Sequence, residues 1–449
     1  MDFPLPHQLI LFGPPGTSKS YLARNDKALQ AGAGHHDIVS VTFHPDYSYG
    51  EFVARLLPLT QAKVITYDMY SGPFLRALAS AYGYWADHVE GQPVQNVVLL
   101  IDEINRGNCA EIFGDVFQLL DRADDGWSSY EISVSDLTIK ALDAELERFE
   151  LVRAQLPKHL QASLNDRCLK LPPNLFLIAT MNTSDESVFF MDSAFKRRWN
   201  FEFCPAGFKG VPKEQAAATV TESPDRDWET VLNALNAFIL AECPSRNMDD
   251  KLIGPWFIKA KPKIDKTLGI THKAKIDELA TLAQGVTVSN KGRDCSNAFD
   301  TELAKFANSL EAPVRDRIFA FAQYDKAAKS NKIKAIDCDK IYFYYFSKDH
   351  KHGSGNVIET FLEGLGKLCS QASTHAVSRS DIHGKLLLFL WDSVFERDKS
   401  PLAKKLKVPV SELRTFGQFV EKADDFIGRL CDGEKAPQAT VVSKTSALV

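Results

Sequence analysis

A glycine-rich turn followed by lysine and serine lies close to the start of the chain. It follows the mostly apolar run 7–12 and precedes a helix-like run at 21–24, and its residues are Gly13, Pro14, Pro15, Gly16, Thr17, Ser18, Lys19 and Ser20. Glycines let successive backbone N–H groups curve around a phosphate, and the start of a helix adds partial positive charge. In such a loop the lysine reaches the β- and γ-phosphates of a nucleotide, and the serine hydroxyl binds Mg²⁺. The pattern therefore predicts a nucleoside triphosphate site; the alternative is a Gly-Pro turn that binds no ligand.

One position departs from the usual phosphate-loop pattern. Ser18 stands where GxxxxGK[ST] has its second glycine. If this residue must adopt a positive φ, serine costs on the order of 1 kcal/mol relative to glycine. We therefore expect local backbone strain at Ser18.

Two acidic residues follow a second apolar run. Residues 97–101 are all aliphatic, and Asp102 and Glu103 come directly after them. A parallel strand covered on both faces delivers such residues to its carboxyl end, beside the phosphate loop. Asp102 would then hold Mg²⁺ through water, and Glu103 would polarise the attacking water. The alternative is a buried strand followed by a helix cap.

A third strand and a short helix complete the candidate site. The strand-like run 174–181 leads into Asn182, whose amide could bond the lytic water or the γ-phosphate. The run 191–199 is predicted to be helical, with Arg197 and Arg198 in its last turn. Either arginine could act across a subunit boundary as an arginine finger. The alternative is that both only interact with the dipole at the end of the helix.

Together these segments resemble the McrB family, the AAA+ motors of modification-dependent McrBC restriction systems. The resemblance is firm over 7–205 and patchy at 230–260 and 380–400, and its motifs are GPPGTSKS (13–20), FHPDYSYGEFV (43–53), LIDEINRGN (100–108) and MNTSDESVFFMDSAFKRRW (181–199). It implies that Lys19 and Ser20 bind phosphate and Mg²⁺, that Asp102 binds Mg²⁺ and that Glu103 activates water. It further implies that Asn182 is the residue called sensor 1 and that Arg197 or Arg198 is the finger. McrB relatives form hexameric rings, and many prefer GTP to ATP, so the resemblance implies a homo-oligomeric ring and GTP or ATP as substrate.

The resemblance also implies a separate partner. Family members with the full restriction role carry an N-terminal domain that reads modified DNA, whereas here the first strand begins within ten residues of Met1. We therefore expect that domain to be absent. No nuclease constellation is visible in the sequence, so a McrC-like nuclease or another effector subunit is expected, with DNA contacted directly or through that partner.

The expected fold is α/β. We predict an AAA+ nucleotide-binding domain over residues 1–205, a mainly α-helical lid and C-terminal region over 206–433, and a flexible tail over 434–449. In the first domain we expect a strand at 38–43, a hairpin formed by 63–67 and 70–73, helices at 74–86 and 109–122, and a strand-like run at 127–134. One long helix is predicted over 137–161, within a helical insertion at about 135–166. Its apolar stripe, made of Leu142, Leu146, Phe149, Val152 and Leu156, either packs on the domain or touches DNA or a partner in a ring pore. Beyond residue 205 we expect helices at 228–241, 274–282, 297–310, 314–328, 357–369, 382–395 and 411–430.

Composition limits the remaining possibilities. The chain has 449 residues, 45% of them hydrophobic and 25% charged, with a net charge of −5, which is ordinary for a globular protein and argues against a nucleic-acid coat. No apolar run approaches the ~20 residues needed to cross a bilayer, so no membrane contact is expected. The eight cysteines are scattered without close pairs, which favours reduced thiols and a cytoplasmic protein. Lysine runs at 259–275 and 326–334 are read as solvated helical faces rather than phosphate-binding patches, and the pattern at 350–352 does not favour a metal site.

The sequence therefore predicts a Mg²⁺-dependent NTPase that serves as the ring motor of a system acting against foreign DNA. A second hypothesis is an assembly module with little hydrolysis, in which Ser18 slows the chemistry and nucleotide locks a ring that recruits an effector. A third is a protein-remodelling ATPase similar to MoxR.

Overall fold

The computed structural model describes residues 3–61, 64–86, 92–182, 189–220, 223–243, 251–262 and 375–432, together with residues 88 and 248 and short pieces within 278–309. The chain divides into two compact units. One comprises residues 1–209, 232–257 and 389–402, and the other comprises 210–231, 258–388 and 403–449. Within the described ranges, no helix is both long enough and apolar enough to cross a membrane.

A five-stranded parallel sheet forms the centre of the first unit, which confirms the predicted α/β fold, although the edge strand at Asn200–Phe203 was not predicted. Its strand order is β2 (Ile38–Thr42), β5 (Val97–Asp102), β8 (Leu175–Asn182), β1 (Gln8–Gly13) and β9 (Asn200–Phe203). Gly13 pairs with Asn182, and Thr42 pairs with Asp102. Since all neighbouring strands run parallel, their carboxyl ends bring Gly13, Asp102 and Asn182 to the same edge of the sheet.

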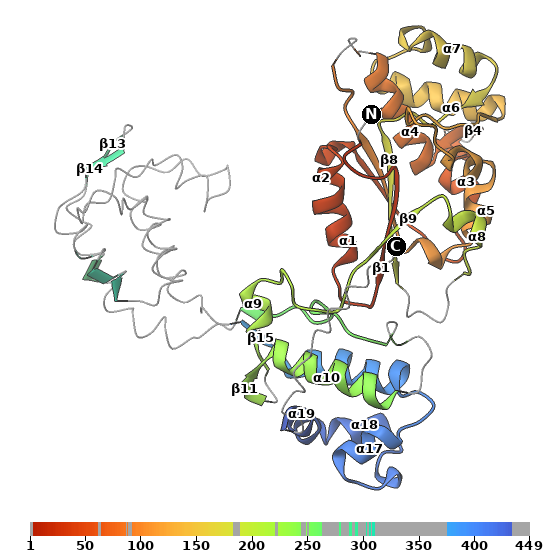
Figure 1. The fold of residues 1–449 in the computed structure, drawn as a ribbon. Helices are drawn as coiled ribbons and strands as arrows, with labels where there is room; N and C mark the ends of the chain where they lie inside the picture. The colour runs from red at the N-terminus through yellow and green to blue at the C-terminus, as the bar shows by residue number, and fades with distance from the viewer. Residues whose placement is uncertain are drawn as a thin grey trace, which may run out of the picture. The chain divides into compact units, whose positions relative to one another are not determined.

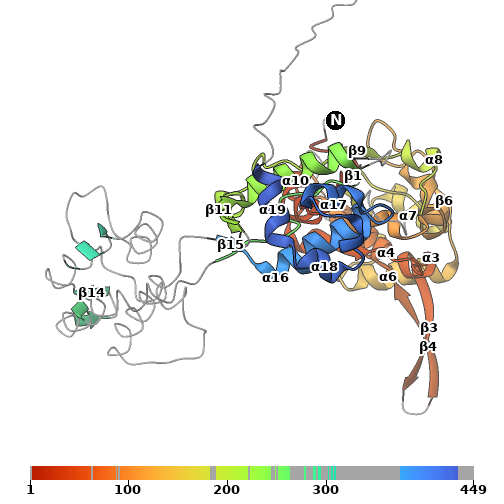
Figure 2. The same ribbon diagram turned by 90° about the horizontal axis from the view of Figure 1, so that it is seen from below.

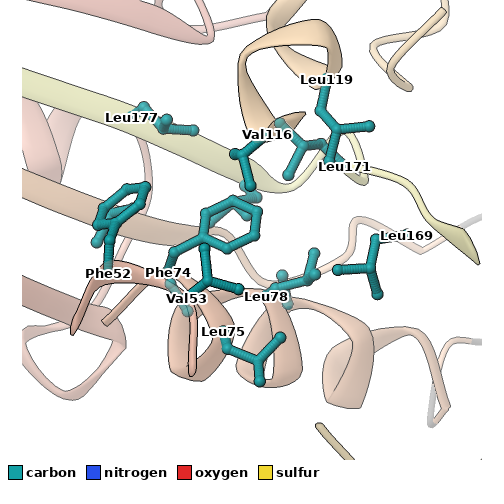
Figure 3. Packing of buried hydrophobic residues seen from close by; sticks show 14 of the residues in the cluster. Phe52, Val53, Phe74, Leu75, Leu78, Val116, Leu119, Leu169, Leu171 and Leu177 are labelled. Carbon is teal, nitrogen blue, oxygen red and sulfur yellow. The ribbon is translucent and has the colours of Figure 1, made fainter. Parts of the chain in front are cut away.

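Helices cover both faces of this sheet, which explains why its three central strands, β5, β8 and β1, are buried along most of their length. Leu99 and Ile101 of β5 belong to one buried cluster, while Val98 and Leu100 belong to another on the opposite face. In Figure 1, α1 (Lys19–Leu22) and α2 (Ala28–Gln30) lie on one side of the sheet, and α4 (Pro73–Ala86) and α6 (Asp136–Glu147) lie on the other. The larger of the two clusters includes Phe52, Phe74 and Leu177, whose side chains pack against one another in Figure 3.

The inserted hairpin is longer than expected and begins earlier. β3 (Ala54–Gln61) pairs with β4 (Val64–Ser71) along eight antiparallel residue pairs. The prediction of two arms at 63–67 and 70–73 was wrong, because both segments fall on β4 or just after it. Figure 2 shows the hairpin projecting past α3 (Tyr49–Phe52) and α6. Apolar side chains lie exposed along it, with Ile65 at 65% and Tyr67 at 67%, so burial was a poor guide to its register.

The single helix predicted over 137–161 is interrupted. It consists of α6, a 3₁₀ turn at Arg153–Gln155 and α7 (Lys158–Asn165). Glu150 adopts a left-handed backbone with φ 59°, which a continuing helix does not allow. Leu142 and Leu146 are buried as expected, but Phe149 and Val152 are 50% and 54% exposed. The stripe therefore covers the core only along α6.

Two neighbouring elements are also shorter than predicted. The helix expected at 109–122 is α5 (Cys109–Phe113) followed by a 3₁₀ helix at Gly114–Leu120, and the two meet at Gly114. Gly114 has φ 46° and lies against the ring of Tyr49. The strand-like run 127–134 contains only the short β6 (Ile132–Ser133), paired with β7 (Cys168–Leu169).

The second unit is helical but contains a small sheet that was not predicted. Its strand order is β11 (Ser223–Asp227), β10 (Thr219–Val220), β15 (His375–Val377) and β12 (Lys261–Pro262). The helix predicted at 228–241 is confirmed as α10 (Trp228–Glu242), which runs on into the first unit. The run 382–395 is helical with π-type turns at Ile382–Leu387 and Leu390–Val394, and 411–430 contains α18 (Phe416–Val420) and α19 (Ala423–Asp432).

Several predictions concern residues that the structure does not describe in full. The helices at 274–282, 297–310, 314–328 and 357–369, most of the two lysine runs, the segment 350–352 and the tail 434–449 lie outside the described ranges. Two lysines of the first run are described, Lys259, which is exposed, and Lys261. Lys261 forms an ion pair of 3.0 Å with Asp381, which also pairs with Lys385 at 2.8 Å. These contacts, together with a hydroxyl hydrogen bond from Ser378, hold the pKa of Asp381 well below its ordinary value.

Candidate nucleotide site

The phosphate loop curves between β1 and the first turn of α1. Gly16 has φ 78° and Ser18 has φ 61° with ψ 26°. Ser18 therefore adopts the left-handed conformation that usually favours glycine, and the strain expected at this position is present. The Lys19 side chain is buried at 7% exposure, and its ammonium group donates to the carbonyl oxygens of Gly13 at 3.0 Å and Pro14 at 2.7 Å. The lysine thus lies within the curve of its own loop.

The first acid lies directly beside this loop. Asp102 ends β5, and its Oδ1 accepts a hydrogen bond of 2.7 Å from the Ser20 hydroxyl. The same Oδ1 also accepts from the hydroxyl of Thr180, a residue of β8 that is only 1% exposed. Thr180 Oγ1 in turn accepts from the backbone N–H of Glu103 at 3.2 Å. One buried hydroxyl therefore ties the two acidic residues together.

The second acid faces the end of β8. Glu103 has φ 54° and ψ 49°, a tight left-handed turn that breaks the strand immediately after Asp102. The side-chain amide of Asn182 donates to Glu103 Oε1. Asn105, which is 3% exposed, donates from Nδ2 to the carbonyl oxygen of Asn182 at 2.7 Å, and Arg106 Nε lies 3.6 Å from Glu103 Oε2. The Glu103 carboxylate is thus oriented by a chain of amides and a nearby guanidinium group.

The two candidate finger arginines lie in different surroundings. Arg198 donates to the Asp121 carboxylate at 2.6 Å and to the Ala194 carbonyl at 3.1 Å, and its guanidinium carbon lies 3.9 Å from the ring centroid of Phe117. Its side chain is only 9% exposed. Arg197 is exposed at the C-terminal end of α8 (Ser193–Lys196). The structure therefore brings Lys19, Ser20, Asp102, Glu103 and Asn182 together at one sheet edge, whereas Arg198 is engaged in a packing contact.

Comparison with known proteins agrees with this geometry. The sequence profile described as "AAA domain (dynein-related subfamily)" matches residues 8–199. This segment is an AAA domain. The match extends from the start of β1 past the end of α8, so it contains every residue of the candidate nucleotide site. The match to this family supports the interpretation that the chain is a P-loop enzyme that hydrolyses a nucleoside triphosphate.

Two relatives with named roles are similar to this chain. The BsuMI type II restriction enzyme component YdiS of Bacillus subtilis (strain 168) is 28% identical over 280 residues, which cover 57% of this chain and 73% of YdiS. The type IV methyl-directed restriction enzyme EcoKMcrB subunit of Escherichia coli (strain K12) is 28% identical over 203 residues, covering 44% of this chain and 36% of that subunit. The chain thus spans about a third of the length of the McrB subunit. The chain resembles McrB-like AAA+ NTPases, in agreement with the motifs.

Two polar residues of the AAA domain were missed in the sequence analysis. Thr180 is the last buried residue of an otherwise apolar strand, and Asn105 lies within the motif LIDEINRGN. A buried hydroxyl or amide needs a hydrogen-bond partner. A polar side chain inside a strand that ends at the site was therefore a usable signal for a residue that orients the acids.

The oxygen atoms at this edge suit a magnesium ion. Ser20 Oγ and the Asp102 carboxylate lie within hydrogen-bond distance of each other beside the loop. Mg²⁺ prefers oxygen ligands, keeps several waters, and is commonly held by one or two protein groups together with substrate phosphates. Ser20 and Asp102 are therefore the residues that would hold the ion in the AAA domain.

Proposed function

We propose that this chain is a Mg²⁺-dependent nucleoside triphosphatase of the McrB type. The observation that supports it best is a pair of hydrogen bonds at one edge of the sheet. Asp102 accepts from Ser20 of the phosphate loop, and Glu103 accepts from Asn182. Burial alone would not place two carboxylates, an amide and a lysine-bearing loop at the ends of adjacent parallel strands. A magnesium ion bound there would neutralise charge on the β- and γ-phosphates.

Each residue then has a definite task. The backbone N–H groups of residues 16–19 and the Lys19 ammonium bind the phosphates, and Ser20 and Asp102 hold the metal ion. Glu103 accepts a proton from the attacking water or orients that water for in-line attack. Asn182 holds the Glu103 carboxylate in place and contacts the γ-phosphate or the lytic water. The Thr180 hydroxyl fixes the spacing of the two acids.

We assign the arginine finger to Arg197 and not to Arg198. Arg198 would have to break its contacts to Asp121 and Phe117 to reach another subunit, whereas Arg197 is exposed and free of a described ion pair. A phosphate loop supplies positive charge from one side only, and the transition state needs a cation from the other side for fast turnover. A ring, with Arg197 of each subunit reaching the nucleotide of its neighbour, meets that need, and a hexamer is the expected form.

The cellular role that fits is restriction of foreign DNA together with a separate effector. Support comes from YdiS and the EcoKMcrB subunit, both of which are named as components of restriction enzymes. The partner is expected to be a McrC-like nuclease, with DNA bound directly or through it, in the cytoplasm.

The test is phosphate release from ATP and from GTP, measured with and without Mg²⁺ and DNA. Wild type should turn over at least one nucleotide in the presence of Mg²⁺, while Lys19→Ala should abolish nucleotide binding. Lys158→Ala, at an exposed position of α7, is the matched control and should behave as wild type. Hydrolysis that persists unchanged in Lys19→Ala would contradict the proposal.

The left-handed Ser18 supports a second candidate function. In that case the strained loop slows the chemistry, and bound nucleotide locks a ring that recruits an effector. The same assay separates the two, because an assembly module binds nucleotide and forms rings with little phosphate release.

A further inference from the structure

A segment about 240 residues downstream bonds to the outer side of the phosphate loop. Within the first unit, the N–H of Gly254 donates to the Pro15 carbonyl at 2.8 Å, and the N–H of Trp256 donates to the Gly16 carbonyl at 2.8 Å. The Gly13 and Pro14 carbonyls accept from Lys19. Each of the four carbonyls from Gly13 to Gly16 therefore has a donor, two of them supplied by this segment.

Two glycines make this approach feasible. A Cβ on Gly254 would lie 2.4 Å from both the carbonyl carbon and the oxygen of Gly16 and 2.6 Å from the Thr17 nitrogen. A Cβ on Gly16 would lie 2.4 Å from the nitrogen of Phe257. These neighbours are backbone atoms that cannot rotate away, so the contact exists only while position 254 has no side chain.

The segment is itself held firmly to the first unit. Asn236 of α10 bonds both backbone groups of Ile253, donating to its carbonyl at 2.9 Å and accepting from its N–H at 3.0 Å. Ile253 and Gly254 are buried, and the Phe257 and Phe389 ring centroids lie 5.2 Å apart. The phosphate loop is thus bonded to a segment that is itself held in place by contacts with α10 and Phe389.

We propose that residues 253–257 form a clamp that holds the phosphate loop in its phosphate-binding curve. In a curve of this kind the N–H groups that bind the anion point inward, so the carbonyls of the same peptide units, here those of Pro15 and Gly16, point outward. Bonding the outward carbonyls of Pro15 and Gly16 keeps the N–H groups aimed inward before nucleotide arrives, and binding then loses less chain entropy. Gly254 and Asn236 are therefore positioning residues for the nucleotide site. The expected effect on nucleotide affinity rests on the proposed function. The clamp itself can be observed without nucleotide.

The decisive variant is Gly254→Ala, which must move the clamp away from the loop. Nucleotide affinity is measured with the mant derivatives of ATP and GTP, and backbone amide exchange is followed in peptides covering 10–20 and 251–258. We expect affinity at least ~10-fold weaker than wild type, with faster exchange in both peptides. Gly207→Ala is the matched control, because a Cβ there meets no atom within 4 Å, and it should match wild type in both measurements.

A second, less disruptive variant tests the clamp if circular dichroism shows that Gly254→Ala does not fold. Asn236→Ala removes both bonds to Ile253 and leaves the loop untouched, and should weaken mant-nucleotide affinity about 3-fold or more and accelerate exchange over 251–258. Asn233→Ala is its control, being exposed on the same helix. Wild-type affinity or unchanged exchange in the folded clamp variants would overturn the clamp. If wild type binds neither nucleotide, the proposed function fails, while the exchange measurement still decides whether the clamp exists.

Discussion

Arg197 and Arg198 are adjacent in sequence, yet their replacement by alanine should produce different defects. We expect Arg198→Ala to lose stability and Arg197→Ala to lose turnover. Arg198→Ala removes a charged hydrogen bond to a partly buried carboxylate, a bond of a type that contributes about 1.5–3 kcal/mol to stability. It also removes the contact with the Phe117 ring, of a type that contributes about 0.5–1 kcal/mol. We therefore expect Arg198→Ala to lower the free energy of unfolding by about 2–4 kcal/mol. At about 2–4 °C per kcal/mol for a unit of this size, the melting temperature should fall by roughly 5–15 °C.

Arg197→Ala should leave stability almost unchanged, within about 0.5 kcal/mol, because the side chain is exposed. Its turnover should fall at least ~10²-fold, a conservative share of what an arginine finger contributes, with nucleotide affinity within a few-fold of wild type. Thermal unfolding and steady-state phosphate release on the same preparations measure both quantities.

Mixing the two kinds of half-site tests the shared site directly. Arg197→Ala subunits retain the phosphate loop, and Lys19→Ala subunits retain the finger, so a mixed ring contains some complete sites. Partial recovery of turnover is expected on mixing, and wild-type activity should rise with protein concentration. The reasoning is refuted if Arg197→Ala turns over normally, if Arg198→Ala shows the turnover defect at unchanged stability, or if a dilute monomer is fully active.

Three further predictions concern single side chains of the first unit. Ser18→Gly should raise the free energy of unfolding by roughly 0.5–1 kcal/mol, since glycine relieves the left-handed strain; chemical denaturation measures this, and a loss of stability would contradict it. Thr180→Val removes the hydroxyl shared by Asp102 and Glu103 and should lower kcat about 10-fold, equivalent to about 1.4 kcal/mol, with KM within about 3-fold. Thr180→Ser should restore kcat, and equal rates for the Val and Ser variants would count against the role. Burial and the nearby Arg122 lower the pKa of His7 from its ordinary 6.5 to about 4. Between pH 6.5 and 4, His7 therefore binds a proton in the unfolded chain but not in the folded protein. The free energy of unfolding should therefore fall as the pH drops from 6.5 towards 4, by about 2 kcal/mol after allowance for partial solvent exposure, and His7→Phe should lack this part of the pH dependence in urea titrations.

The central sheet and the acid-bearing strand ends could be predicted because they follow from local patterns. Five aliphatic residues before Asp102 are typical of a strand covered on both faces, and the order of the motifs then places the acids beside the loop. The predictions failed where one residue's backbone or a distant contact decided the structure. Glu150, with φ 59°, ends α6 although the apolar spacing continues through Phe149 and Val152.

Long-range partners account for the rest. Nothing in the order of residues shows that Arg198 pairs with Asp121, a residue 77 positions earlier, so the two adjacent arginines looked equivalent. The clamp likewise joins residues 15–16 to 254–256, and the order of residues at 249–260 (DDKLIGPWFIKA) does not indicate which atoms this segment bonds. The exposed hairpin could not be placed because β-pattern reasoning assumes a buried face, which β3 and β4 lack along much of their length.

The central claim, hydrolysis of a nucleotide by water that Glu103 activates, is tested most directly by multiple-turnover phosphate release from Glu103→Gln. This variant keeps the size of the side chain and its bond to Asn182 but removes the base. At saturating nucleotide and Mg²⁺, we expect turnover at least ~10²-fold below wild type, with nucleotide affinity within a few-fold, so that the nucleoside triphosphate remains trapped on the protein. Turnover equal to wild type at the same occupancy would contradict the account.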